Sequence, residues 1–366
     1  MNTPLPGSSL SLVVPPELDG QRLDSLLAAL VPGLSRSAAA HAVEGGFVAL
    51  AGVPCLKTAR RLATGDLVQY TSPPLLEPTA APEDLPLNVL YADGSLAVLD
   101  KAPGMVVHPA RGHASGTLVN ALVFRWGLTP GVGDLRPGIV HRLDKGTSGL
   151  LVVARNAQAK EALQQDFLGR RVEKIYLALC LGVPKADAGF CDAPIERHPR
   201  DRKRYTSRTG EGRSALTEWK VLHRGPGLSL LAIRLHTGRT HQIRVHLSDL
   251  GFPVACDEDY GGLAFGRVNT RPLRDLLARQ QRPLLHATSL AFTHPVSGDQ
   301  MRFCAPPPPD MQEVLAQAFG AEARAELTDG TRLGSVLGGL FGLLPLGDGL
   351  DAGLHAAPQV DDLFEG

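Results

Sequence analysis

The chain has 366 residues, of which 43% are hydrophobic, so it is long enough for two domains and a sizeable core. Its 37 basic and 37 acidic residues give a net charge of +0, which argues against a strong nonspecific nucleic-acid binder. Five scattered cysteines without a C-x-x-C pair argue against a disulfide framework and a zinc site. Because neither a signal peptide nor a long uncharged apolar run is visible, we expect a cytoplasmic protein without a membrane partner.

The charges are unevenly distributed along the chain. Basic residues dominate the segment 197–213, and acidic residues dominate the last twenty positions, which contain no Lys or Arg. The basic side chains of the first segment are Arg197, Arg200, Arg202, Lys203, Arg204, Arg208 and Arg213. A basic surface and an acidic tail therefore cancel in the sum. We expect Arg202, Lys203 and Arg204 to contact RNA.

Residues 1–11 are rich in Pro, Ser and Gly and are expected to be disordered, and a compact unit follows at residues 12–70. Leucines at helical spacing predict a helix that begins near Leu23 and ends near Leu30. Ser35 is a good N-cap for a second helix, Arg36 to Val43, which ends at two glycines. Short strands are expected at residues 47–50 and 67–70.

This order of elements resembles the RNA-binding domain named after small-subunit ribosomal protein S-four. The R-L-D-x-x-L start, the L-S-R-S step and the G-D-x-V close are all present, although Ala51 stands where Asn is usual. The resemblance implies RNA binding through basic side chains that face phosphates. The candidates are Arg36, Lys57, Arg60 and Arg61. The alternative is a solvated basic face on an ordinary small domain.

Residues 71–86 contain five prolines and are expected to form a semi-rigid linker to a larger domain at residues 87–310. That domain opens with two strand-like runs around Asp93-Gly94, which predict a β-hairpin. Further on, Asn156 is a good N-cap for a helix from Ala157 to Leu168. A helix is also expected to start at Thr117, and strands at residues 172–179 and 228–235.

A segment dense in polar residues and Gly carries Asp144 between two apolar runs, Ile139-Val140 and Leu150 to Val153. We expect both runs to be buried strands and Asp144 to lie on the loop between them. Three basic neighbours, His141, Arg142 and Lys145, favour an ionised carboxylate, which suits a nucleophile or base. The alternative is a turn in which the Asp side chain bonds its own backbone.

The run HRLDKGTSGLLVVA, residues 141–154, resembles the catalytic signature of the RluA/RluD-type pseudouridine synthase family. Three further motifs follow in the family's order: K-x-Y-x-A around Tyr176, GRTHQIRVHL around Arg244, and LLHA around Leu285. Together the resemblance covers roughly residues 12–308. It implies that Asp144 is the nucleophile, that Tyr176 stacks on an extruded uracil, and that Arg244 pairs with Asp144.

The same resemblance assigns the substrate contacts. Arg142 matches the family arginine that fills the space vacated by the extruded base, and Leu285 an apolar residue of the uracil pocket. We also expect His141 and Thr147 to contact the substrate. His241 and His246 are five residues apart and fall off a common helix face, so a zinc site is not expected there.

The sequence therefore predicts an α+β protein with a mixed, mostly antiparallel sheet crossed by helices. Its expected activity is the isomerisation of uridine to pseudouridine in RNA, by a monomer with no cofactor and no metal. The first candidate substrate is 23S ribosomal RNA at the helix 69 uridines. The alternatives are other ribosomal or transfer RNA sites, a noncatalytic RNA-binding ribosome assembly factor, and a base-removing hydrolase. Glycosidases need two carboxylates, whereas the motifs place one, which favours an isomerase.

The resemblance ends near Met311, so residues 311–366 are predicted to be a C-terminal extension that is partly disordered. A helix is expected over residues 312–327. The Gly- and Leu-rich acidic remainder is expected to be flexible.

Overall fold

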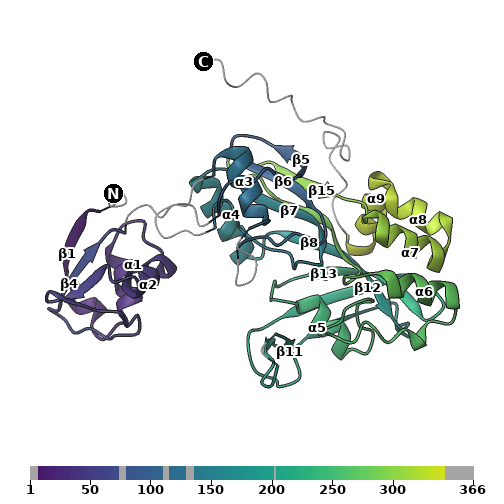
Figure 1. The fold of residues 1–366 in the computed structure, drawn as a ribbon, viewed down its shortest axis with the longest axis horizontal. Helices are drawn as coiled ribbons and strands as arrows, with labels where there is room; N and C mark the ends of the chain where they lie inside the picture. Colours follow the sequence, from purple (N-terminus) through teal and green to yellow (C-terminus); the bar gives the residue numbers. More distant parts are fainter. Residues whose placement is uncertain (1–6, 74–79, 110–114, 129–135, 202, 343–366) are drawn as a thin grey trace, which may run out of the picture. The chain divides into compact units, whose positions relative to one another are not determined.

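A computed structural model of the protein describes residues 7–73, 80–109, 115–128, 136–201 and 203–342 (Figure 1). The chain divides into two compact units. The first comprises Met1–Asp84, His108–Ser115 and Val119–Pro137, and the second comprises Leu85–Val107, Gly116–Leu118 and Gly138–Gly366. Across the described ranges, no helix combines the length and the apolar character that a membrane span requires.

The first unit contains a small antiparallel sheet in the order β1-β4-β2-β3, built from β1 (Ser9–Val13), β4 (Leu67–Thr71), β2 (Val48–Leu50) and β3 (Val53–Pro54). Its helices are η1 (Pro16–Leu18), α1 (Leu23–Leu30), α2 (Arg36–Glu44) and, apart from its first residue, α3 (Leu118–Trp126). The leucines of α1 and the alanines of α2 pack with Val48, Val68 and Tyr70 of the sheet into one core.

The predicted helices of this unit are confirmed. The Ser35 side chain accepts a hydrogen bond from the Ala38 backbone N–H at 3.2 Å, as an N-cap does, and α2 ends at Gly45. Burial of one apolar stripe on each helix explains why both form here despite being short. The assignment of residues 12–70 as an S-four-type domain, with its boundaries, stays a prediction.

The second unit is organised around a nine-stranded sheet in the order β5-β6-β7-β14-β8-β13-β12-β9, in which β15 also pairs with β14. Its strands are β5 (Asn88–Ala92), β6 (Leu96–Lys101), β7 (Ser148–Ala154), β8 (Glu173–Leu181), β9 (Ala188–Asp192), β12 (Leu216–Arg224), β13 (Leu228–Leu235), β14 (Leu285–Thr293) and β15 (Gln300–Cys304). A separate two-stranded ribbon joins β10 (Glu196–Arg197) and β11 (Tyr205–Thr206). Only β7 and β14 pair in parallel among the described strands, so the predicted mixed, mostly antiparallel sheet is confirmed.

Helices cover this sheet in two groups. Helix α4 (Ala157–Leu168) packs Ala159 and Leu163 against β6, β7 and β14, and Asn156 caps it as predicted, accepting from the Ala159 N–H at 2.8 Å. Helices α6 (Arg271–Arg279), α7 (Pro309–Phe319), α8 (Ala321–Thr328) and α9 (Gly330–Phe341) contribute to a second core with β8 and β13 (Figure 1). The remaining helical segments are α5 (Gln242–Asp249) and η2 (Phe265–Arg267).

The prediction of a strand at Ile139-Val140 is wrong. Ile139 makes a single isolated bridge to Val153. The reason lies two residues further on, where the His141 ring nitrogen Nε2 accepts the Val152 N–H at 3.0 Å. A side chain therefore takes the place that a backbone carbonyl would have in a continuing ladder.

The single helix predicted over residues 312–327 is also wrong. Gly320 has a φ of +94°, which is incompatible with a continuous helix, and it separates α7 from α8. The flexible tail predicted to follow begins with the helix α9, in which Leu333, Leu337 and Phe341 lie at i, i+4 spacing and are buried. Residues 343–366 of the predicted flexible tail lie outside the described residues.

Gly149 lets β7 and β14 pair beside the Asp144 loop. Its φ is +107°, and a Cβ atom there would lie 2.2 Å from the backbone oxygen of Ala287, its partner on β14. Next to it, the Ser148 hydroxyl and His286 Nδ1 are hydrogen-bonded at 3.0 Å. Both β7 and β14 are buried along most of their length, so this junction cannot relax toward solvent.

We expect Gly149→Ala to lower the free energy of unfolding by more than about 3 kcal/mol, because the new methyl group meets backbone and the residue must keep a positive φ. The matched control is Gly94→Ala, at a turn where nothing lies within 4 Å of the position that a Cβ atom would take. Denaturant unfolding of both variants measures the difference. Equal stability of the two would contradict the close approach of β7 and β14.

Candidate active site

The loop that carries Asp144 is held by its backbone. The Thr147 N–H donates to the Asp144 carbonyl at 3.1 Å, and the Gly104 N–H donates to the Lys145 carbonyl at 2.7 Å. On the other side, the Arg282 guanidinium donates to the Gly146 carbonyl at 3.1 Å. Within the described parts of the chain, the Asp144 side chain makes no hydrogen bond to backbone, in contrast to the alternative of a simple Asx turn.

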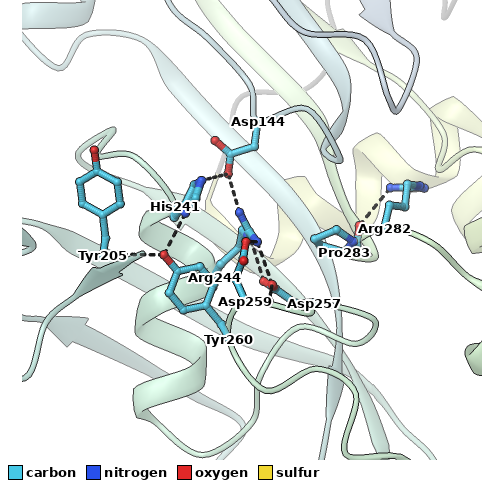
Figure 2. Close-up of polar contacts among 9 residues, drawn as sticks. All are labelled: Asp144, Tyr205, His241, Arg244, Asp257, Asp259, Tyr260, Arg282 and Pro283. Atoms are coloured by element: carbon cyan, nitrogen blue, oxygen red, sulfur yellow. Dashed lines mark hydrogen bonds and ion pairs between the residues drawn. The ribbon is translucent and has the colours of Figure 1, made fainter. Parts of the chain in front are cut away.

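Two cationic or polar side chains of a second segment face the Asp144 carboxylate (Figure 2). Arg244 Nη1 lies 3.6 Å from Asp144 Oδ2, and His241 Nε2 lies 4.0 Å from the same oxygen. The carboxylate side chain retains 21% of its exposure. The structure thus brings the proposed nucleophile and the arginine of the third motif together, as the resemblance implies.

Arg244 faces Asp144 through a single nitrogen, and its two parallel hydrogen bonds are made elsewhere. The two parallel bonds of Arg244 go to Asp257, from Nε at 2.7 Å and from Nη2 at 2.8 Å. Nη2 also donates to Asp259 at 2.7 Å. Because the fork is occupied, only Nη1 is left to face Asp144, at a distance longer than a hydrogen bond.

Arg244 is charged in this setting. Burial by itself lowers the pKa of Arg244, but the hydrogen bonds and charge of Asp257, together with the charge of Asp144, raise that pKa above its ordinary value. The Asp257 side chain has no exposed surface, and the positive charge of Arg244 balances its negative charge. The ring of Tyr260 adds a second contact, since the Arg244 guanidinium carbon lies 4.9 Å from its centroid.

Tyr176 and Leu285 complete one wall of the site. The two residues lie on neighbouring strands. Leu285 of β14 pairs with Ala178 of β8, two residues beyond Tyr176. Tyr176 is 7% exposed, and burial followed by the charge of Asp144 raises the pKa of its phenol above the ordinary value. The hydroxyl is therefore protonated at neutral pH and available as a hydrogen-bond donor.

These residues line one cavity of about 640 Å³. All seven residues predicted to act on or bind the substrate border it: Asp144, Tyr176, Arg244, His141, Arg142, Thr147 and Leu285. The volume is in the range of small-molecule sites, so one extruded nucleoside fits. Their individual roles stay predictions.

His141 borders the cavity and also makes contacts within the protein. Its Nε2 accepts the Val152 N–H, and its ring stacks on Phe167 with centroids 4.4 Å apart. Burial and the nearby Lys174 lower the pKa of His141 to about 3, so the ring is neutral. We infer that His141 chiefly shapes the loop and presents an edge to the cavity.

Several residues of the cavity were not singled out from the sequence. Phe167, at the end of α4, supports Lys174, whose ammonium lies 5.5 Å from the ring centroid. Burial and the charge of Arg170 lower the pKa of Lys174 to about 8. Lys174 is the lysine of the K-x-Y-x-A motif, so its motif position was the available signal. Nothing in the sequence marks Phe167 beyond its place in an apolar stripe.

The other predicted RNA contacts differ in their surroundings. Lys57 and Arg60 are exposed, Arg61 donates to the Gly20 carbonyl, and Arg36 pairs with Asp24 at 3.3 Å. In the basic segment Lys203 is exposed, and the Arg204 guanidinium lies 5.2 Å from the Tyr260 ring centroid. Arg202 lies outside the described residues.

Residues 95–249 match the family model described as RNA pseudouridylate synthase. The chain is 43% identical over 327 residues to the ribosomal large subunit pseudouridine synthase D of Xanthomonas campestris. The aligned region covers 88% of this chain and 96% of that protein. The chain belongs to the RNA pseudouridine synthase family. An uncharacterized RNA pseudouridine synthase of Chloroflexus aurantiacus is 45% identical over 306 residues, covering 84% of this chain and 92% of the relative.

A solved structure agrees with this assignment. The human RNA pseudouridylate synthase domain containing 1 superposes with a TM-score of 0.50 at 28% identity, over 63% of this chain and 89% of that one. The predicted family, the predicted α+β fold and the predicted enzyme class are therefore confirmed. The protein is an RNA pseudouridine synthase, an isomerase that acts on uridine in RNA.

Arg244→Lys is expected to damage both the fold and the catalysis of this synthase. A lysine ammonium is a single point charge and cannot serve Asp257, Asp259 and Asp144 at once. The free energy of unfolding should fall by about 3 kcal/mol, because buried Asp257 loses its partner. The single-turnover rate at saturating RNA should fall by roughly tenfold or more, because Asp144 loses its position.

The control for this variant is Arg224→Lys, at an Arg–Asp pair whose Asp187 side chain is 90% exposed. It should change the free energy of unfolding by less than about 1 kcal/mol. Denaturant unfolding and rapid-quench kinetics provide the two measurements. If Arg244→Lys weakened RNA binding and left the saturated rate unchanged, Arg244 would be an RNA contact instead.

Proposed function

We propose that this synthase converts uridine to pseudouridine in ribosomal RNA, with Asp144 as the residue that attacks the ribose. The observation that carries the proposal is the position of the Asp144 carboxylate, which faces Arg244 and His241 in a cavity lined by Tyr176 and Leu285. The names of relatives from Xanthomonas campestris and Xylella fastidiosa, both ribosomal large subunit pseudouridine synthase D, support the ribosomal substrate.

The uridine must leave the base stack to reach Asp144, which costs a few kcal/mol. Its uracil enters the cavity between the ring of Tyr176 and the side chain of Leu285. Arg142 is exposed at the border of the same cavity and fills the space that the base leaves. Stacking on a flat ring holds the uracil while its bond to the sugar changes.

In the reaction, the bond from the sugar to uracil N1 is replaced by a bond from the sugar to uracil C5. Asp144 attacks the anomeric carbon of the ribose, or removes its 2′ proton, and the bond from the sugar to uracil N1 breaks. The uracil then turns and C5 bonds to the anomeric carbon. As it does so, the bond from Asp144 to that carbon breaks or, in the second route, the 2′ proton returns to the sugar. Finally C5 loses its hydrogen while N1 gains one. All atoms of the nucleotide are conserved, so the reaction needs no oxidant or reductant. The protonated Tyr176 hydroxyl, close to the uracil, is placed to donate a hydrogen bond during the turn.

The first candidate substrate is 23S ribosomal RNA, at the helix 69 uridines. Other ribosomal or transfer RNA sites remain the alternative substrates. A noncatalytic assembly factor would not need Asp144, Tyr176 and Arg244 around one cavity, which argues against that class. We further propose that the enzyme acts as a cytoplasmic monomer. Mapping the pseudouridines of a deletion strain identifies the modified sites.

We expect Asp144→Asn to lower pseudouridine formation by at least about a hundredfold, because the amide keeps the shape but cannot act as nucleophile or base. The assay uses RNA that carries tritium at uracil C5, which is released to water when C5 loses its hydrogen. Glu161→Gln, on the exposed face of α4, is the charge-matched control and should keep full activity. Release of free uracil by the wild type would instead indicate a hydrolase.

The exposed side chains of Lys57 and Arg60 are expected to contact RNA phosphates. The double variant Lys57→Gln, Arg60→Gln should weaken RNA binding and reduce the slope of log affinity against log salt by roughly one to two. Removing two exposed arginines elsewhere, with Arg271→Gln and Arg332→Gln, is the charge-matched control. Equal slopes for the two double variants would mean that net charge, not the N-terminal unit, sets the salt dependence.

A further inference from the structure

His241 has a backbone conformation that few side chains adopt. Its φ and ψ are +57° and 18°, in the left-handed region, at the residue that precedes α5. For a residue other than Gly, Asn or Asp this conformation costs on the order of 1 kcal/mol, so other contacts must hold it. The contacts that do so involve the imidazole ring, which lies between Tyr205 and Tyr260 (Figure 2).

The hydrogen bonds of Tyr260 determine which nitrogen of His241 carries a proton. The Tyr260 hydroxyl accepts the Tyr205 N–H at 2.8 Å and lies 2.9 Å from His241 Nδ1. Tyr260 is 3% exposed, and among the described residues its hydroxyl makes hydrogen bonds only with the Tyr205 N–H and with His241 Nδ1. The hydroxyl therefore donates to Nδ1, since a buried donor is normally satisfied. The ring proton of neutral His241 then sits on Nε2, toward Asp144.

The two oxygens of Asp144 have different surroundings. Both His241 Nε2, at 4.0 Å, and Arg244 Nη1, at 3.6 Å, face Oδ2. No hydrogen bond from the described residues reaches Oδ1, and both of these contacts are made to Oδ2. Hydrogen-bond donors to one oxygen fix the orientation of a carboxylate and leave its other oxygen free to react. Distances of this kind are common in enzymes without substrate, where catalytic hydrogen bonds are often longer than in the substrate complex.

We propose that His241 is a positioning residue, which turns the free oxygen Oδ1 of Asp144 toward the ribose by donating to Oδ2 from Nε2. The inference rests on the proposed role of Asp144 and extends it to a chain of contacts from Tyr205 through Tyr260 and His241. A neutral donor suits this task because Arg244 already supplies the positive charge. Burial lowers the pKa of His241, and Arg244 lowers it further, against the opposing effects of Asp144, Asp257 and Asp259. The ring is thus neutral at physiological pH.

Two substitutions separate this role from a purely structural one. His241→Gln can place an amide donor near the position of Nε2, whereas His241→Asn can reach only the position of Nδ1. Asn tolerates the left-handed backbone better than Gln does. A positioning role predicts that Gln is the more active variant, and a structural role predicts that Asn is.

The experiment measures single-turnover rates at saturating RNA, RNA affinity and thermal unfolding for the wild type and both variants of the full chain. We expect the rate of His241→Asn to fall by roughly tenfold to a hundredfold, with unchanged affinity and melting temperature. The rate of His241→Gln should fall by less than roughly fivefold. The inference is overturned if His241→Asn is as fast as the wild type or faster than His241→Gln, or if the loss appears in affinity alone.

A third variant tests the tautomer without touching His241. Tyr260→Phe removes the proton donated to Nδ1 and should lower the saturated rate by at least roughly threefold. An unchanged rate would overturn the assignment of the proton to Nε2. The wild type and Asp144→Asn are run in parallel. An active wild type together with an inactive Asp144→Asn supports the proposed function independently of the His241 result, and an active Asp144→Asn defeats that function itself.

Discussion

The buried pairing of Arg244 with Asp257 is the interaction on which the site depends. It joins the first turn of α5 to the segment after it, and both side chains are almost fully removed from solvent. Two charges buried in this way are costly unless geometry and hydrogen bonding are complete, and a bidentate pair meets that condition. With its orientation set by Asp257 and Asp259, the guanidinium can present only one nitrogen to Asp144.

This distribution of the Arg244 hydrogen bonds favours the reactivity of the Asp144 carboxylate. If Asp144 itself received the two short bonds of Arg244, the ground state of the carboxylate would be stabilised and its attack would be slower. The structure instead gives the strong bonds to Asp257, which has no proposed chemical role, and leaves the weaker contact for the proposed nucleophile. The charge of the cavity lining has a separate effect. Of the described residues that line the cavity, only Asp144 is acidic, so the surrounding positive charge favours the approach of the RNA phosphates.

The order of the strands in the sheet brings the motifs together at one end of the central strands. Strands β7 and β14 are parallel, so the loop before Ser148 and the start of β14 at Leu285 lie at the same end. Strand β8 runs antiparallel to β14 and places Tyr176 opposite Ala287, and β13 pairs its Ile233 with Tyr176 before leading toward His241. The motifs were recognisable from sequence because each is a short continuous run that resembles a signature of the family. Their convergence follows from the strand order, which a single sequence does not display.

What sequence reasoning missed has a common physical cause. The helix α4 and the strand β13 have the predicted bounds because their signals are local, an N-cap at Asn156 and a run of apolar residues. The ring of His141 bonding to Val152, the fork of Arg244 bonding to Asp257, and the packing of α9 with β8 and β13 all depend on contacts between distant segments. Propensity and periodicity carry no information about such partners.

The same long-range contacts connect the basic ribbon to the carboxylate. Tyr205 belongs to β11, in the segment rich in Arg and Lys, and its backbone N–H holds the Tyr260 hydroxyl that sets His241. Arg204, the neighbouring residue, packs on the same Tyr260 ring that Arg244 contacts. Tyr260 therefore links Arg204 to Asp144 by two routes, one through the ring of His241 and one through the guanidinium of Arg244. The ribbon and the Asp144 carboxylate are in this way parts of one packed network.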